Sequence, residues 1–345
     1  MIARAALWIG TYPADGPDAP AGTGEGVWRA ELTDAGLTGH LAAATPAPSF
    51  LAVSADGRTL FAAGETSPGS VTRFAVAPDG ALAQRERVAS GGVHPCHLLL
   101  HPDERALYVA NYSSGSLAVL QLEPAEDGLR VAGGVAQVFE HSGRGPHAER
   151  QEGPHVHSTL LAPGGRVLLA IDLGTDEVRR YLVGPDGRLT VDGVAARLPP
   201  GTGPRHGLVL GEHLVVVGEL SGTLHLLRWD PATASAHEVD VAPVCGPHEG
   251  PSLAAHVLED GEDLLVSVRG PDVVARFGVR DGRLVHRGDT PVGAWPRHMA
   301  LVGGRLVVGA QGGGTVTAYP APASPAGGAG AAVLAVPTPA CVVPA

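Results

Sequence analysis

The 345-residue sequence contains no lysine, since all 24 of its basic residues are arginine. An internal lysine Schiff base is therefore excluded, and arginine is the only permanently charged receptor for anions. The formal net charge of −11 argues against nucleic acid as a partner, because binding to a phosphate backbone requires a basic surface. A local group of arginines is still compatible with a small anionic substrate.

Cysteines and long hydrophobic runs are scarce as well. The three cysteines, Cys96, Cys245 and Cys341, are too few and too scattered for a disulfide framework or a zinc site, so we expect free thiols. No apolar run reaches the ~18–20 residues of a membrane helix. The first residues lack the apolar segment and cleavage site of a secretory signal. We therefore expect a cytoplasmic protein that does not associate with membranes.

Glycine and proline are abundant, with 49 and 30 residues, and fall at intervals between apolar runs, which is typical of tight turns. Six segments repeat one pattern, in which an apolar strand, a tight turn and a second apolar strand follow each other: 49–65, 96–111, 157–172, 205–219, 253–269 and 297–311. A third strand follows each segment, and several segments have a fourth after an Asp-Gly turn. Apolar spacing nowhere follows a helical period. Four short strands per repeat of 40–50 residues predict an all-β fold, a β-propeller with four-stranded blades.

The two ends of the chain supply a seventh repeat. Residues 6–12 resemble a second strand that lacks a first. In the tail, we interpret VLAV (333–336) as the last strand of the final blade and ACVV (340–343) as the innermost strand of the first. Joining both ends in one blade closes a seven-bladed ring and removes exposed sheet edges. The alternative is a frayed, low-complexity tail. We expect a single domain over 1–345, with a low-complexity linker at 320–331.

The repeat also predicts where polar side chains gather. The start of the first strand and the end of the second lie at the same end of each blade, near the central axis. One register position at the second strand's end carries polar residues, namely Glu65, Asn111, Asp172, Glu219, Arg269 and Gln311. The first strands begin near further candidates, namely His155, His157, Arg205, Arg297 and His298. An insertion at 139–154 leads into the same face. A single histidine or arginine in a propeller turn is usually solvated, but this joint placement predicts a binding site.

A metal site is a weaker alternative at the same place. His155 and His157 project to one side of a strand, but no third ligand is fixed by the spacing. The acids and Asn111 offer oxygen ligands to Ca²⁺ or Mg²⁺. Because three arginines would crowd the same mouth, we expect neither a metal nor another cofactor.

The segment 141–181 carries GP-x-x-ERQ-x-GPH-x-HS and DLGTD in order. With SFLAVSADGRTLFAAGE and GTGPRHGLVL, it resembles the bacterial lactonase family of seven-bladed propellers. That family includes propeller-type 6-phosphogluconolactonases and is similar to fungal carboxymuconate-lactonizing enzymes. The resemblance implies a catalytic group of His157, Arg205, Glu219 and Arg269. Blades five to seven differ from the family in their glycine-rich turns, and this difference bears on substrate selectivity more than on the fold.

The resemblance implies hydrolysis of a sugar-acid lactone, with 6-phosphogluconolactone as the leading substrate. Either Glu219 or His157 would take the proton from water, Arg205 and Arg269 would stabilise the oxyanion, and Arg297 would contact the phosphate. His155, His298, Asn111, Asp172, Glu65 and Gln311 are the further candidates for substrate binding. One alternative is a muconate-type lactonizing enzyme. Another is a non-catalytic scaffold, which would show an aromatic-rich patch on an outer face.

Overall fold

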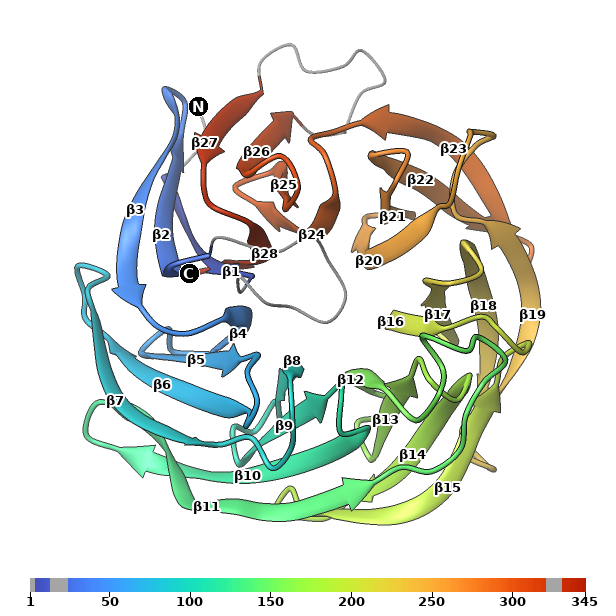
Figure 1. Ribbon diagram of the computed structural model, residues 1–345, viewed down its shortest axis with the longest axis horizontal. Coiled ribbons are helices and arrows are strands. Elements are labelled where there is room, and N and C mark those ends of the chain that lie inside the picture. Colours follow the sequence, from blue (N-terminus) through green and yellow to red (C-terminus); the bar gives the residue numbers. More distant parts are fainter. Residues whose placement is uncertain (1–3, 13–23, 321–330) are drawn as a thin grey trace.

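The structure, a computed structural model, describes residues 4–12, 24–320 and 331–345. Every regular element in these ranges is a β-strand, and the strands form seven four-stranded antiparallel sheets. The sheets are arranged as blades around a central axis (Figure 1). The seven-bladed β-propeller predicted from the repeats is confirmed.

Six blades are each built from four consecutive strands, which run from the axis to the rim. Three of them are β4 (Pro48–Val53), β5 (Thr59–Gly64), β6 (Ser70–Val76) and β7 (Leu82–Ala89); β8 (Pro95–Leu100), β9 (Ala106–Asn111), β10 (Ser116–Ala125) and β11 (Gly128–Glu140); and β12 (Val156–Leu161), β13 (Val167–Asp172), β14 (Glu177–Val183) and β15 (Leu189–Arg197). The other three are β16 (Pro204–Leu210), β17 (His213–Gly218), β18 (Thr223–Asp230) and β19 (Ser235–Pro243); β20 (Leu253–Asp260), β21 (Asp263–Arg269), β22 (Val273–Arg280) and β23 (Arg283–Pro291); and β24 (Pro296–Val302), β25 (Arg305–Ala310), β26 (Thr315–Pro320) and β27 (Ala332–Ala335).

The remaining blade joins the two ends of the chain. Its order is β28 (Pro339–Pro344), β1 (Ala5–Thr11), β2 (Gly26–Thr33) and β3 (Gly36–Ala44). Strand β28 pairs with β1, and β27 pairs with β26, as predicted for ACVV and VLAV. Of the linker predicted at 320–331, residues 321–330 lie outside the described residues. Closure by a strand from the opposite end of the chain pairs the inner edge of β1 and completes a fourth strand in this blade.

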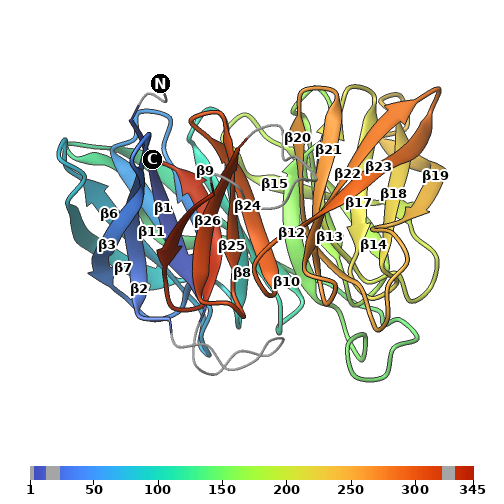
Figure 2. The same cartoon turned by 90° about the horizontal axis from the view of Figure 1, so that it is seen from above.

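The core lies between neighbouring blades, whose sheets pack face to face around the axis (Figure 2). Leu226 from β18 and Phe277 from β22 belong to one such buried cluster, so each sheet face packs against the next. Full burial of one large apolar side chain contributes about 1.5–3 kcal/mol. This inter-blade packing makes the ring a rigid support for the loops at its ends.

Six inner strands begin with a β-bulge, and this feature positions the polar side chains. In β16, Pro204 pairs with Gly218 and His206 with Val217, so that Arg205 between them has no opposite residue on β17. The bulged residues are Ser49, Cys96, His157, Arg205, Ala255 and Arg297. A bulge redirects a side chain away from the alternation of the strand. Three of the predicted site residues therefore share one local backbone geometry.

The main-chain carbonyls of the bulged residues connect adjacent blades. Cys96 Sγ donates to the carbonyl of His157 at 3.3 Å, and Ser158 Oγ donates to that of Arg205 at 2.8 Å. Arg205 Nη1 in turn donates to the carbonyl of Ala255 at 2.8 Å. A carbonyl left out of the strand ladder needs another donor, and the neighbouring blade supplies it.

The insertion after β11 is fixed to the ring by one buried glutamine. Gln151 is fully buried, and its Nε2 donates to the carbonyl of Leu173 at 2.9 Å and to Asp176 Oδ1 at 2.8 Å. A Cβ at Gly174 would overlap the carbonyl oxygen of Gly153, so only glycine allows this close approach. The insertion, drawn in green, protrudes at one end of the ring (Figure 2).

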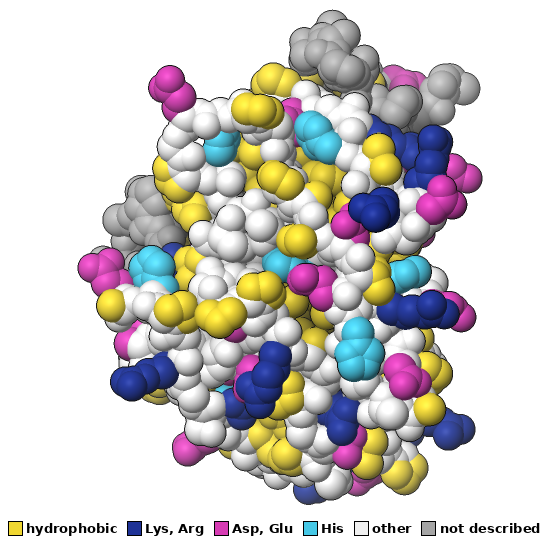
Figure 3. All heavy atoms as spheres, turned by 90° about the vertical axis from the view of Figure 1, so that its right-hand side faces the viewer, with side chains coloured by type: hydrophobic (Ala, Val, Ile, Leu, Met, Phe, Trp, Pro, Cys, Tyr) yellow, Lys and Arg dark blue, Asp and Glu magenta, His cyan; other side chains and the backbone are white. Residues whose placement is uncertain are grey.

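The rim of the ring shows a mixed surface. On the side that includes β19 and β23, exposed apolar side chains are interspersed with arginines, acids and histidines (Figure 3). Every exposed large apolar side chain among the described residues is Leu or Val, such as Val191, Val239 and Val285. The described rim therefore lacks the aromatic-rich patch expected of a scaffold.

Candidate active site

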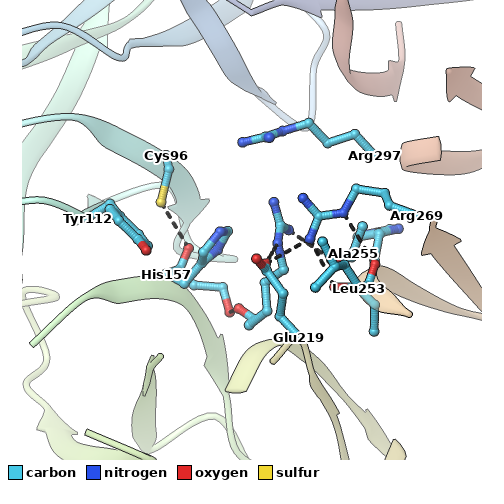
Figure 4. A network of polar contacts seen from close by, with 12 residues as sticks. Cys96, Tyr112, His157, Glu219, Leu253, Ala255, Arg269 and Arg297 are labelled. Atoms are coloured by element: carbon cyan, nitrogen blue, oxygen red, sulfur yellow. Dashed lines mark hydrogen bonds and ion pairs between the residues drawn. The ribbon is translucent and has the colours of Figure 1, made fainter. Parts of the chain in front are cut away.

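Glu219 lies at the centre of a group of arginines (Figure 4). Its Oε2 accepts a hydrogen bond from Arg205 Nε at 2.6 Å and forms an ion pair with Arg269 Nη2 at 2.9 Å. Its Oε1 accepts a hydrogen bond from Arg150 Nη2 at 3.0 Å. A single carboxylate facing three guanidinium groups leaves a net positive charge, which favours an anionic ligand.

Two of these arginines are also held by the main chain. The Arg205 side chain donates to the carbonyl of Ala255 and is only 4% exposed. Arg269 is 1% exposed and donates to the carbonyls of Leu253 at 3.3 Å and Ala254 at 3.4 Å. Their guanidinium groups are therefore oriented before any substrate binds, as electrostatic catalysis requires.

Arg150 is the outermost arginine and was not among the sequence candidates. Its side chain is 23% exposed, and it also donates to Tyr112 Oη at 3.3 Å. Arg150 lies in the insertion, in the ERQ triplet that precedes the two histidines. The insertion had been placed over this face, so the triplet was the signal that could have identified Arg150. Tyr112 directly follows Asn111 and was also missed.

His155 and His157 lie beside Tyr112 but differ in their partners. The His155 ring stacks on Tyr112 with centroids 4.4 Å apart, and its two nitrogens face the Tyr112 carbonyl at 3.1 Å and Glu152 Oε1 at 3.1 Å. His157 meets the Tyr112 ring edge-on at 5.8 Å, and its Nδ1 is buried without a hydrogen-bond partner. Of the two histidines, only His157 therefore has a ring nitrogen that no protein group occupies.

Arg297 reaches the same space from the opposite side of the axis (Figure 4). Its guanidinium lies 4.3 Å from the ring centroid of Tyr12, and its Nη1 donates to Gln311 Oε1 at 3.4 Å. Tyr12 Oη in turn donates to Glu65 Oε1 at 3.3 Å. Glu65 and Gln311 thus form part of the surroundings that orient Arg297.

The strand register corrects the prediction of one polar position around the axis. Asn111 pairs with Pro95 and Asp172 with Val156, whereas Pro204 pairs with Gly218, one residue before Glu219. The predicted polar residues therefore occupy two adjacent positions, the first with Asn111 and Asp172, and the second with Glu65, Glu219, Arg269 and Gln311. Side chains at adjacent strand positions point to opposite faces, so the two sets have different surroundings.

Asn111 and Asp172 bind loops in the structure. Asn111 Nδ2 donates to the carbonyl of Ser90 at 3.3 Å. Asp172 Oδ1 accepts the main-chain N–H groups of His155 at 2.8 Å and Gly174 at 3.0 Å, and its Oδ2 lies 2.6 Å from His141 Nδ1. Asp172 therefore holds the backbone of His155 in place.

The arrangement of the described acidic side chains does not support the weaker alternative, a metal site. Glu65 and Glu219 lie against Tyr12 and the arginines, and Asp172 lies against His141. In the described parts of the chain, no three His, Cys, Asp or Glu side chains are placed to hold a metal ion.

The comparison with known proteins places this geometry in a family. The model of the family described as "Lactonase, 7-bladed beta-propeller" matches residues 6–344. The chain belongs to this family. It is 31% identical over 304 residues to the 6-phosphogluconolactonase of Bacillus subtilis, covering 84% of this chain and 83% of the relative.

Solved structures are similar along the whole length. The periplasmic gluconolactonase of Pseudomonas aeruginosa is 27% identical, with a TM-score of 0.85 and 99% of each chain covered. A protein from Lactobacillus plantarum is also 27% identical, with a TM-score of 0.86, covering 99% of this chain and 100% of the other. As a member of this family, the chain is an enzyme that hydrolyses lactones. The described residues form no helix of the length and apolarity needed to cross a membrane.

Within this lactonase family site, the charges separate the two candidate bases. Burial opposes ionisation of Glu219, but Arg269, Arg205 and Arg150 outweigh it and hold the pKa of the carboxyl well below its ordinary value. Burial also keeps the pKa of His157 well below its ordinary value, and Arg205 acts in the same direction. Glu219 is thus a fixed carboxylate, and His157 a neutral imidazole, near neutral pH.

The arginines stay charged in spite of their burial. Burial and the neighbouring Arg269 lower the pKa of Arg205 to about 10, with Glu219 acting in the opposite direction. The pKa of Arg269 is also lowered, mainly by burial. A pKa near 10 still leaves the guanidinium positive near neutral pH, so both arginines can stabilise an oxyanion.

Proposed function

We propose that the chain hydrolyses the lactone ring of a phosphorylated sugar acid, 6-phosphogluconolactone being the best-supported substrate. The observation that carries this proposal is a carboxylate shared by three arginines beside His157, a neutral histidine whose Nδ1 has no partner in the protein. The Bacillus subtilis relative bears the name of this activity. Opening a lactone requires an activated water, a site for an oxyanion and a proton for the leaving alkoxide.

His157 is the general base in this mechanism. A water molecule attacks the lactone carbonyl while the imidazole of His157 takes its proton. The ring C–O bond then breaks, and the same proton passes from the imidazolium to the leaving alkoxide. Both carboxylate oxygens of Glu219 are already paired with arginines, which also make it a weaker base than an ordinary carboxylate, whereas His157 Nδ1 has no partner in the protein.

Arg205 and Arg269 bind the oxyanion that forms at the carbonyl. Both are buried and held by main-chain carbonyls, so they need little reorganisation during the reaction. Glu219 keeps the two guanidinium groups together against their mutual repulsion. The developing negative charge also favours the protonated form of the nearby His157.

Arg297 and Arg150 are the contacts for the phosphate. Arg150 is partly exposed beside Glu219, and Arg297 is held in the same space by Tyr12 and Gln311. Arginine pairs with phosphate through two parallel hydrogen bonds, which adds geometric selectivity to the charge.

No divalent metal takes part in the proposed mechanism. We expect the purified enzyme to hydrolyse 6-phosphogluconolactone faster than the spontaneous reaction, and to keep its full rate after treatment with EDTA. The rate is followed by release of acid. A loss restored by Ca²⁺ or Mg²⁺ would overturn metal independence and leave the hydrolysis itself intact.

The same preparation distinguishes the alternative functions. Lactonization of a carboxymuconate without lactone hydrolysis would assign the site to the reverse chemistry. No reaction with either substrate, together with a stable protein partner, would favour a scaffold. The lack of nucleic-acid and membrane partners and the cytoplasmic location remain predictions, and the Pseudomonas relative is named as periplasmic.

A further inference from the structure

A layer of histidines contains the candidate base His157, and its four other members have no role in the proposed hydrolysis. The ring centroids of His157 and His206 lie 5.3 Å apart, as do those of His206 and His256. His298 stacks on His256 at 3.9 Å. His97 lies 5.4 Å from His206 on the other side. Five imidazoles from five consecutive blades thus form one continuous layer, which we call the histidine ring.

The bulges explain why these side chains meet. His97, His206, His256 and His298 each follow the bulged residue of an inner strand. Phe50 occupies the same position in its blade and completes the layer, 4.4 Å from His97. The bulged residues carry the catalytic groups, and the residues after them carry the layer beside those groups.

The histidine ring is buried but still reached by solvent. His97, His206 and His298 are 8%, 6% and 7% exposed, and His256 is half-buried. Burial lowers the pKa of His97 and of His256 to about 3, with contributions from Arg205. At neutral pH the ring therefore offers uncharged imidazoles, which both donate and accept hydrogen bonds.

Main-chain contacts decide which nitrogen carries the proton in two of them. The main-chain N–H of Thr159 donates to His97 Nδ1 at 3.4 Å, and that of Val342 donates to His298 Nδ1 at 3.3 Å. Each imidazole must then carry its hydrogen on Nε2, which becomes a donor. A metal ligand needs the lone pair of that nitrogen instead, so these two histidines are oriented against metal binding.

Two further ring nitrogens in the layer have no partner in the protein, namely His157 Nδ1 and His256 Nδ1, and both are buried. A buried polar atom left without a partner is costly, so it is expected where water or a ligand completes it. The histidine ring thus combines two fixed donors with two ring nitrogens that no protein group satisfies.

We propose that the histidine ring is the subsite that binds the hydroxyl groups of the sugar lactone. A hydroxyl both donates and accepts, and so matches neutral imidazoles in either role. An apolar ligand would leave the ring nitrogens of His157 and His256 without partners. An anionic group would meet no charged side chain within the histidine ring itself. This inference rests on the proposed function, because it assumes that the lactone carbonyl lies on Arg205 and Arg269.

The test compares two lactones with the same six-membered ester ring, D-glucono-δ-lactone with hydroxyls and δ-valerolactone without. A site built to bind hydroxyls strongly rejects an analogue that lacks them. We therefore expect kcat/KM to favour gluconolactone by about 10³-fold or more. In His256→Leu this preference should fall by roughly tenfold or more, since one unpaired hydroxyl carries such an effect. The rate with δ-valerolactone should stay within about twofold.

Two further variants keep the result interpretable. His256→Asn retains an acceptor and should recover part of the preference. His225→Leu removes another buried histidine, which contacts Glu238 and Thr223 outside the ring, and should leave the preference unchanged. Binding of D-gluconate, measured by calorimetry, should weaken in His256→Leu by a similar factor.

The outcomes separate the two levels of the proposal. An equal preference in wild type and His256→Leu, with both lactones hydrolysed, would overturn the hydroxyl subsite and leave lactone hydrolysis standing. Failure of the wild type to hydrolyse any lactone would overturn the proposed function first. Unchanged D-gluconate binding in a folded His256→Leu variant would contradict the subsite independently of turnover.

Discussion

At the residue scale, the distribution of charge around Glu219 determines which side chain can accept a proton. Oxygen Oε2 of Glu219 faces Arg205 and Arg269, and Oε1 faces Arg150. Removing one partner of a buried ion pair leaves an uncompensated charge, which destabilises a protein by about 3–5 kcal/mol. Glu219 therefore acts as an organiser of the arginines, although the sequence alone left it equal to His157 as a base.

Arg150 gives a prediction about the substrate anion. Replacing Arg150 with Met removes a charged hydrogen bond of about 1.5–3 kcal/mol, so KM for 6-phosphogluconolactone should rise by roughly tenfold or more. The value of kcat should change little, because Arg205 and Arg269 remain. Steady-state kinetics of Arg150→Met and of Arg144→Met, an exposed arginine in the same insertion, provide the comparison. Equal KM values in both variants would remove Arg150 from substrate binding.

At the element scale, the inner strands show what could be predicted from the sequence. Closure of the ring by residues 340–343 followed from counting strands, and the structure has it. The polar position could not be predicted to the residue, because polar side chains occur at either of two adjacent positions at the end of the second strand, and the apolar run before them does not show which position a blade uses. The Pro-Arg-His triplets at 204–206 and 296–298 were visible, but their histidines become a layer only when several blades are assembled.

The insertion gives a prediction about positioning. Gln151 fixes the loop that carries Arg150, through Leu173 and Asp176. Gln151→Leu leaves the buried carbonyl of Leu173 without its donor and removes one of the donors to Asp176 Oδ1. An unsatisfied buried acceptor costs about 1–3 kcal/mol, so thermal unfolding should begin at a lower temperature. Its KM should rise as in Arg150→Met.

The double variant tests whether the two effects are coupled. If Gln151 acts through Arg150, combining Gln151→Leu with Arg150→Met should raise KM no further than Arg150→Met alone. Independent, multiplying effects on KM would show that the loop has a separate contact with substrate. A melting temperature lowered without any change in KM would assign Gln151 a structural role alone.

At the scale of the whole molecule, the histidine ring links stability to pH. The unfolded chain binds protons to histidine near about pH 6.5, whereas His97 and His256 in the fold do so only near a pKa of about 3. Between these values the unfolded state binds more protons, so stability must fall as pH falls from about 6.5 towards 3. Each such histidine contributes up to about 1.4 kcal/mol per pH unit.

Urea unfolding at several pH values measures this dependence. The free energy of unfolding should decrease steadily below about pH 6.5, and the decrease should be shallower in His256→Leu than in the wild type. His101, another buried histidine whose pKa is lowered mainly by burial, lies outside the ring, so His101→Leu shows how much of the pH dependence comes from a buried histidine elsewhere. A wild-type stability that stays constant down to about pH 4 would contradict the neutral state of the ring.

The pH dependence of kcat/KM for 6-phosphogluconolactone, measured in the wild type, Glu219→Gln and His157→Asn, tests the central claim most directly. Because His157 must be neutral to act as a base and its pKa lies well below the ordinary value, the wild-type rate should stay constant down to about pH 6 and decline only below it. Glu219→Gln should be slower but keep an acid limb. His157→Asn should lose the limb and about 10²–10⁴-fold of the rate. An acid limb that disappears in Glu219→Gln but persists in His157→Asn would make Glu219 the base and contradict this account.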